Sequence, residues 1–368
     1  MGLRRRLVRF ALARPRVLLV VAPDGDGVGR DVESALLRGG WSTASSPADA
    51  DLLVVAGNPG PELTAAVDVL WSQVPAPRSC VRLPAANDVG GALDVAAESL
   101  QAWGTQRARA SGPDGDPWLG RGPDEEGDHE GHEGHEGHEV HEVHEGHGDH
   151  GGHGGHGGHG GHEGHGGHGG HGGHGGHGAM MVAGLPMASS APDRDGLELE
   201  VLSLTLGPWM PGAPDGLVVQ ASMQGDVLTG VHVRWADAGA RPLPGGAVRA
   251  LDAVCRVLTL TGPERLLDRA RHARDAVVQQ HPDATQQAGR VVRDLRRSRT
   301  LAWSVRGLPA PGGGDVLDRL HTWCDVLDGA RPPAPVAPGS VAASLEGAEL
   351  AAARLAVACV DVAPGEHP

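Results

Sequence analysis

The sequence of 368 residues has no lysine, no isoleucine and no tyrosine, and its only phenylalanine is Phe10. The missing residue types share A/T-rich codons, so their absence indicates a high-GC genome, such as that of an actinobacterium. Arginine is therefore the only basic residue besides histidine, and the choice of Arg over Lys is no evidence for phosphate recognition.

Cysteine is scarce, and the four cysteines (Cys80, Cys255, Cys324 and Cys359) lie far apart with no C-x-x-C pair. This spacing excludes a zinc ribbon and argues against a disulfide framework. We therefore expect buried, reduced thiols.

Long hydrophobic runs are missing too. The apolar run at residues 17–22 follows an arginine-rich N-terminus and is too short for a signal-peptide core or a membrane span. The sequence predicts a cytoplasmic protein without a transmembrane segment, which would reach the periphery of a membrane only through partners.

The acidic charge is local. The formal net charge is −15, but residues 122–178 hold twelve acids and no arginine. Removing those twelve charges leaves about −3 for the rest of the chain. A nearly neutral remainder gives no electrostatic reason to expect nucleic acid as a partner.

Histidine, by contrast, is concentrated in one tract with an unbroken three-residue register. Glu-Gly-His units dominate its first half, and Gly-Gly-His units follow from His150 onward. The tract histidines are His129, His132, His135, His138, His141, His144, His147, His150, His153, His156, His159, His162, His165, His168, His171, His174 and His177.

Neutral imidazole suits zinc, nickel, copper and cobalt, and tight sites usually need three or four ligands. In an extended chain with three residues per turn, neighbouring histidines would be about 9 Å apart. The glycines permit turns that bring them together. The tract therefore predicts many interchangeable sites for a divalent transition metal, nickel or zinc, which fail below about pH 6 as imidazole protonates.

Upstream of the tract, apolar runs alternate with helical patterns. Strands are expected at 16–22, 51–56 and 78–83, and helices at 30–38, 62–73 and 90–103. The continuous apolar runs are typical of buried parallel strands. Residues 1–107 are therefore predicted to form an α/β domain, a three-layer doubly wound parallel sheet.

Residues 108–195 have too little apolar surface to fold, and they are predicted to be a disordered, metal-binding linker. Residues 196–368 are predicted to form an α+β domain with a small antiparallel sheet and a helical bundle. Its strands are expected at 197–206 and 216–235, with a turn at Gly225-Asp226. Its helical segments are expected at 248–260, 263–280, 284–304 and 315–327, and a proline-rich connector leads to a last segment at 341–362.

Two groups of arginines in these helices are expected on exposed faces, either solvated or contacting an acidic partner. One group is Arg290, Arg293, Arg296, Arg297 and Arg299, and the other is Arg265, Arg269, Arg271 and Arg274.

Residues 50–57 (ADLLVVAG) and 75–78 (PAPR) resemble the 20 kDa Fe–S subunit of NADH:quinone oxidoreductase (complex I) and the related small subunit of [NiFe] hydrogenases. The resemblance covers roughly residues 16–103. Residues 204–211 (LTLGPWMP) and 216–219 (GLVV) resemble the opening sheet of the partner, the 49 kDa or hydrogenase large subunit. The segment 345–362 resembles that subunit's closing strand. The resemblance implies a fusion of two partners in their usual order.

The departures from these families lie at the ligands. The first loop, residues 23–27 (PDGDG), has no cysteine for a 4Fe–4S cluster, and Cys80 lies inside a strand. Met210 stands where the first histidine of the quinone-site hairpin is expected, and Pro214 or Asp215 where the second is expected. We therefore expect no Fe–S cluster and no catalysis by the chain alone.

The leading hypothesis is a degenerate, subunit-like accessory protein of a complex I-like or hydrogenase-like system, with subunits of that assembly as partners. Two alternatives stay open: a genuine Fe–S electron-transfer subunit acting with partners, and a stand-alone nickel or zinc storage protein or metallochaperone.

Overall fold

The computed structural model of the protein describes residues 14–101, 181–182, 185–186, 189–192, 196, 198–237 and 244–363. Contacts between residues group 1–119 with 188–368 in one compact unit and 120–187 in a second. Within the second unit, β5 (Met181–Val182) pairs antiparallel with β6 (Leu185–Pro186). The seventeen tract histidines lie outside the described residues.

The N-terminal half of the first unit contains a parallel sheet with the strand order β2-β1-β3-β4. The strands are β1 (Arg16–Val21), β2 (Ser42–Thr43), β3 (Leu52–Ala56) and β4 (Ser79–Leu83). All five residues of β3 are buried, because β3 is central and both faces of the sheet are covered. The continuous apolar run is thus explained by burial on both sides.

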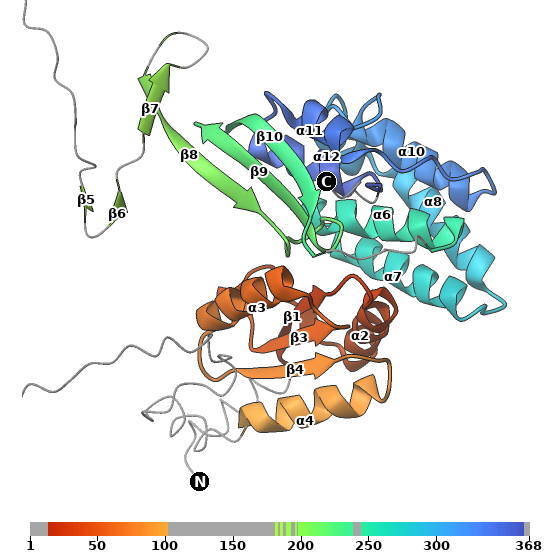
Figure 1. Ribbon diagram of the computed structural model, residues 1–368. Coiled ribbons are helices and arrows are strands. Elements are labelled where there is room, and N and C mark those ends of the chain that lie inside the picture. Colours follow the sequence, from red (N-terminus) through yellow and green to blue (C-terminus); the bar gives the residue numbers. More distant parts are fainter. Residues whose placement is uncertain are drawn as a thin grey trace, which may run out of the picture. The chain divides into compact units, whose positions relative to one another are not determined.

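Helices cover the two faces of this sheet in three layers (Figure 1). Helices α2 (Asp26–Gly39) and α4 (Val89–Gln101) pack on one face, where Val32 and Leu93 join a core with Val54. Helix α3 (Pro61–Gln73) packs on the other face, where Val67 contacts a core with Leu53. A short 3-10 helix, η1 (Pro47–Asp49), links β2 to β3.

The C-terminal half contains a separate antiparallel sheet in the order β10-β9-β8-β7. Its strands are β7 (Ser189–Pro192), β8 (Glu198–Leu206), β9 (Leu217–Gln224) and β10 (Val227–Trp235). The β9–β10 turn has Gly225 at a positive φ of 61°, as hairpin turns require. The register shifts between Thr229 and His232, around Gly230 at φ 59°, which marks a bulge.

Seven helices of the described residues follow this sheet. They are α6 (Gly246–Thr261), α7 (Glu264–Val278), α8 (Ala284–Arg297), α9 (Arg299–Val305), α10 (Val316–Leu327), α11 (Pro338–Leu345) and α12 (Leu350–Ala358). Helix α6 is central: Leu251, Val254 and Leu258 have no exposed surface, and they share one core with Leu217 and Leu228 of the sheet.

The structure confirms a parallel sheet with helices followed by a separate antiparallel sheet with helices. Some boundaries differ from the predictions. Helix α2 begins at Asp26, before the predicted start at residue 30, and so includes Gly29. Glycine is needed there because a Cβ would lie 2.8 Å from the Val21 side chain. The predicted helix 284–304 is broken at Ser298, whose hydroxyl accepts a hydrogen bond from the Leu301 amide and begins α9.

Two further segments differ. The expected closing strand near the C-terminus is largely helical, as α11 and α12. Isolated bridges join Glu349 to Val227 and Val362 to Val336. Residues 189–192, inside the predicted linker, form β7 and pair with β8. Among the described residues, no helix combines the length and the apolar character that crossing a membrane requires.

Candidate functional site

A cavity of about 940 Å³ lies where the two halves of the first unit meet. Its walls come from β1 and α2 of the N-terminal half, and from α6, α7, the loop 209–215 and the end of β10 in the C-terminal half. The volume matches sites that take small organic molecules. The cavity combines an apolar wall with a set of charged side chains, and both are built from elements far apart in the sequence.

Three sets of contacts among the described residues hold the halves together beside this cavity. The Trp209 indole N–H donates to the carbonyl oxygen of Leu19 at 2.7 Å. That carbonyl lies beyond the end of β2, which pairs only with Arg16 and Val17. The loop from the C-terminal half thus satisfies the uncovered edge of β1, which would otherwise present an unpaired acceptor.

The second contact is a helix cap supplied from the other half. Helix α3 has Gly60 at its N-cap with no side-chain cap of its own. Asp237 instead accepts hydrogen bonds from the amides of Glu62 (2.9 Å) and Leu63 (3.1 Å). Gly60 leaves the room for this approach, since a Cβ there would lie 2.4 Å from the Asp237 carboxyl carbon. A carboxylate at a helix N-terminus is favoured by both the free amides and the helix dipole.

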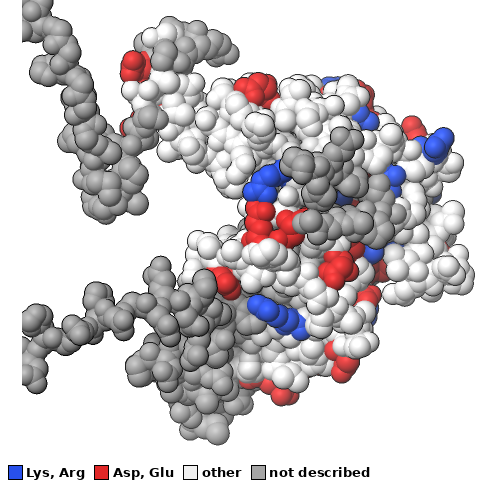
Figure 2. Space-filling model, viewed as in Figure 1, with Lys and Arg blue, Asp and Glu red and all other residues white. Residues whose placement is uncertain are grey.

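Next to this cap, Arg234 of β10 forms a two-pronged ion pair with Glu62, at 2.8 and 2.5 Å. The hydrogen bonds from Arg234 lower the pKa of Glu62 below its usual range. On the face shown in Figure 2, basic and acidic side chains are interspersed, and some adjoin near its middle. This mixture agrees with the nearly neutral composition outside the tract.

The third contact is a buried ionic cluster between α2 and the helices α6 and α7. Arg274 is 3% exposed and lies between Glu33 (2.7 Å) and Asp252 (3.1 Å). Arg271, one turn earlier, approaches Glu33 at 3.3 Å. Because Glu33 belongs to α2, these contacts cross from one half to the other.

The cluster sets the pKa values of its acids in opposite directions. Burial raises the pKa of Glu33, but the charges of Arg274 and Arg271 outweigh it and hold this pKa below its usual range. Burial dominates at Asp252 and raises its pKa, although Arg274 and Arg30 act against it. Arg274 therefore compensates Glu33 more fully than Asp252.

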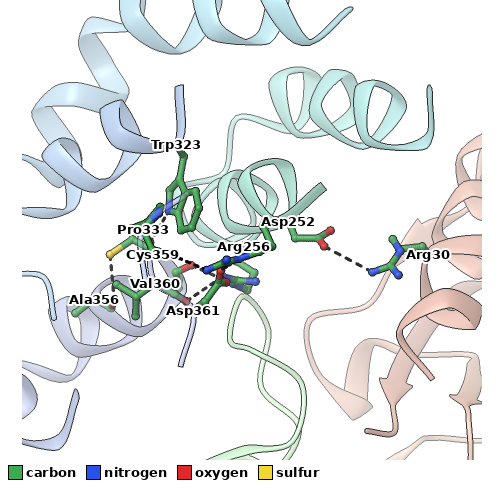
Figure 3. Close-up of polar contacts among 11 residues, drawn as sticks. Arg30, Asp252, Arg256, Trp323, Pro333, Ala356, Cys359, Val360 and Asp361 are labelled. Carbon is green, nitrogen blue, oxygen red and sulfur yellow. Dashed lines mark hydrogen bonds and ion pairs between the residues drawn. The ribbon is translucent and has the colours of Figure 1, made fainter. Parts of the chain in front are cut away.

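A second cluster anchors the C-terminal segment to α6. Arg249 donates to Asp361 at 2.6 Å, and Arg256 donates to the other oxygen of the same carboxylate at 3.0 Å. Arg256 also donates to the carbonyls of Ala358 and Val360. Figure 3 shows Arg256 and Asp361 facing each other, and Arg30 reaching toward Asp252 from the N-terminal half. These buried groups are satisfied almost entirely by one another, which gives them a structural role.

The carboxyl ends of β1 and β3 are the place where a doubly wound sheet usually offers a ligand site, because the strand order reverses there. Here an Asp24–Asn58 pair fills it: the backbone amide and the side-chain amide of Asn58 donate to the two Asp24 oxygens, each at 2.8 Å. The loops are also in contact, since a Cβ on Gly25 would be 2.2 Å from the Ala56 oxygen. No thiol is present in either loop, so the residues do not fit an iron–sulfur cluster.

The cysteines do not converge elsewhere. Cys255, Cys324 and Cys359 are buried free thiols, and Cys80 lies in β4, partly buried. Burial raises the pKa of Cys255 and of Cys359 to about 12, and that of Cys324 to about 11. The prediction of buried, reduced thiols holds for three of them. Within the described parts of the chain, no three His, Cys, Asp or Glu side chains are grouped so that they could hold a metal ion.

The sequence prediction was wrong for two arginines. Arg271 and Arg274 were expected on an exposed helix face, but both point inward against Glu33. A signal for Arg274 was present: it lies seven residues after Leu267 on the stripe that contains Ala270, and both of those residues are buried. An arginine at an apolar stripe position indicates a buried partner. Nothing in the pattern of α2, however, identified that partner as Glu33.

No family model, curated protein or solved structure matches the chain.

Proposed function

We propose that the protein is a cofactor-free fusion of two modules, resembling the 20 kDa and 49 kDa subunits of complex I and their hydrogenase relatives. In this proposal it acts as a non-catalytic accessory or assembly component beside a complex I-like or hydrogenase-like oxidoreductase. Its His-rich insert binds nickel or zinc.

The Asp24–Asn58 pair is the observation that carries the non-catalytic part of this proposal. Both Asp24 oxygens accept hydrogen bonds at 2.8 Å, and those bonds lower the pKa of Asp24. An ionised carboxylate with both oxygens hydrogen-bonded to Asn58 therefore occupies the strand ends, where an iron–sulfur cluster would need thiolates. Replacing soft sulfur ligands by a hydrogen-bonded carboxylate and amide removes the affinity for iron–sulfur chemistry.

The cavity supports the same proposal from the other half. Met210, Pro214 and Asp215 line it at the positions where the resembling family has the paired histidines of its quinone hairpin. The Met210 thioether cannot donate or relay a proton at the first of those positions, so the pair of histidines is not reproduced. The proposal therefore keeps the architecture of the two modules without their redox chemistry.

Metal binding rests on the tract sequence. Seventeen imidazoles in one register, with twelve acids between residues 122 and 178, supply nitrogen ligands and a favourable field for a dication. The tract would buffer metal at several sites of modest affinity while the folded unit acts as its carrier.

Metal analysis tests both parts. Untagged protein, purified without added metal, would be assayed for iron, acid-labile sulfide, nickel, zinc and copper. We expect no stoichiometric iron or sulfide, and several nickel or zinc ions per chain after equilibration. A matched control replaces the seventeen histidines by glutamine and so preserves the length of the insert; it should lose those ions.

The alternatives give different results. Stoichiometric iron and sulfide, with a broad absorbance that dithionite bleaches, would establish a genuine Fe–S subunit and overturn the proposal. Metal binding by the tract without co-purification of any oxidoreductase subunit from the native host would favour a stand-alone storage protein or metallochaperone.

A further inference from the structure

Two arginines on the cavity wall have few partners. Arg30 of α2 has a side chain only 21% exposed, and its nearest acid is Asp252 at 3.6 Å. Arg271 of α7 is 11% exposed, and it approaches Glu33 at 3.3 Å. Neither guanidinium donates a hydrogen bond that meets normal geometry to any acceptor in the described ranges, and the Nε of Arg271 is buried without one.

A buried guanidinium nitrogen without a hydrogen-bond acceptor, such as Nε of Arg271, is unusual. Each guanidinium carries five N–H donors, and buried polar groups in proteins are nearly always hydrogen-bonded. The neighbouring acids are shared: Arg271 only approaches Glu33, at 3.3 Å, while Arg274 lies closer to the same carboxylate, at 2.7 Å. A molecule that enters the cavity with acceptor oxygens would supply partners for both side chains.

The same cavity has an apolar side. Trp209 and Met210 from the loop, and Trp235 from the end of β10, line it together with Arg30 and Arg271. At about 940 Å³ the cavity is much larger than a simple anion needs. A ligand that fills it must bring apolar surface as well as acceptor oxygens.

From these observations we infer that the cavity binds an organic anion, in which a carboxylate or phosphate group lies against Arg30 and Arg271 and an apolar body packs on Trp209 and Met210. The guanidinium fork matches the oxygens of either group and is strengthened by the opposite charge. This inference goes beyond the proposed function and does not depend on it, since it needs neither the metal tract nor a partner subunit.

Calorimetric titration of the full, metal-free chain tests the inference with three probes of equal chain length: decanoate, decyl phosphate and decanol. Each is used below its micellar concentration. We expect one molecule of decanoate or decyl phosphate per chain. The uncharged decanol should bind at least about tenfold more weakly, the loss expected for a hydrogen-bonded charge. The ratio of the two anions identifies the preferred head group.

Variants locate the site. R30Q and R271Q should each weaken decanoate binding about tenfold or more, whereas R30K, which keeps the charge but loses the fork, should fall between R30Q and the natural protein. The matched control is R265Q, on the same helix as Arg271 but exposed and away from the cavity. If R271Q does not fold, R30Q and R30K still show whether the anion binds beside Arg30.

Two results would overturn the inference. One is decanol binding as tightly as decanoate, which would make the cavity a purely apolar site. The other is unchanged anion affinity in folded R30Q, or an equal loss in R265Q, which would place the anion elsewhere on the chain.

Discussion

Replacing Arg274 by methionine should show how strongly the buried cluster holds the two halves together. Methionine keeps most of the length and apolar stem of the side chain but removes the charge that lies 2.7 Å from Glu33 and 3.1 Å from Asp252. Glu33 would then keep only the more distant Arg271, at 3.3 Å, and Asp252 would keep Arg30, at 3.6 Å, so each acid would lose its shortest ion pair. Removing one partner of a buried pair typically costs about 3–5 kcal/mol.

The structure places the expected cost near the lower end of that range. Arg274 itself is 3% exposed, but the side chains of Glu33 and Asp252 are each 20% exposed, so water can partly solvate the charges left behind. We therefore expect Arg274→Met to lower the free energy of unfolding by about 3 kcal/mol at neutral pH. Urea unfolding, followed by far-ultraviolet circular dichroism, would measure the change.

A double-mutant cycle separates the ion pair from general packing. Glu33→Gln removes the acid that Arg274 compensates, so the two substitutions together should cost at least about 1 kcal/mol less than their sum. The control is Arg265→Met, an exposed position on the same helix, which should change stability by no more than about 0.5 kcal/mol. A loss below about 1 kcal/mol for Arg274→Met, or strict additivity with Glu33→Gln, would refute the reasoning.

Three more predictions follow from the same junction. Asp237→Ala should cost about 1 kcal/mol in urea unfolding through loss of the α3 cap. Asp237→Asn should cost less, since Asn tolerates the φ of 54°; equal losses would argue against the cap. In the native protein, Cys255, with a pKa of about 12, should not react with a disulfide reagent at pH 8, whereas all four thiols should react in urea; rapid native labelling of Cys255 would show that it is accessible. The pKa of Glu33 is lower in the folded protein than its value of about 4.5 in the unfolded chain. The contribution of Glu33 to stability is therefore complete above about pH 4.5 and is lost as the pH falls through the folded-state pKa. Between pH 6 and pH 3, the free energy of unfolding should therefore fall less steeply with pH in Glu33→Gln than in the natural protein. Identical slopes would contradict a lowered pKa for Glu33.

Much of the fold was readable from the sequence because it depends on local patterns. The continuous apolar run of β3 predicted a buried parallel strand, and alternation with the Gly225-Asp226 turn predicted the β9–β10 hairpin. The absence of cysteine from the loop 23–27 is also a property of the sequence alone. The metal-binding prediction for the tract belongs here too, since it follows from register and chemistry, and it remains a prediction.

Tertiary structure alone decided the candidate site. Arg274 and Glu33 are 241 positions apart in the sequence, and nothing in either helix pattern specifies the other. The same is true of Asp237 capping α3 and of Trp209 satisfying the edge of β1. Local periodicity records which side of an element is buried, but the partner of a buried charge depends on how distant elements pack. The cavity and its unsatisfied arginines therefore emerge only when the two halves are brought together.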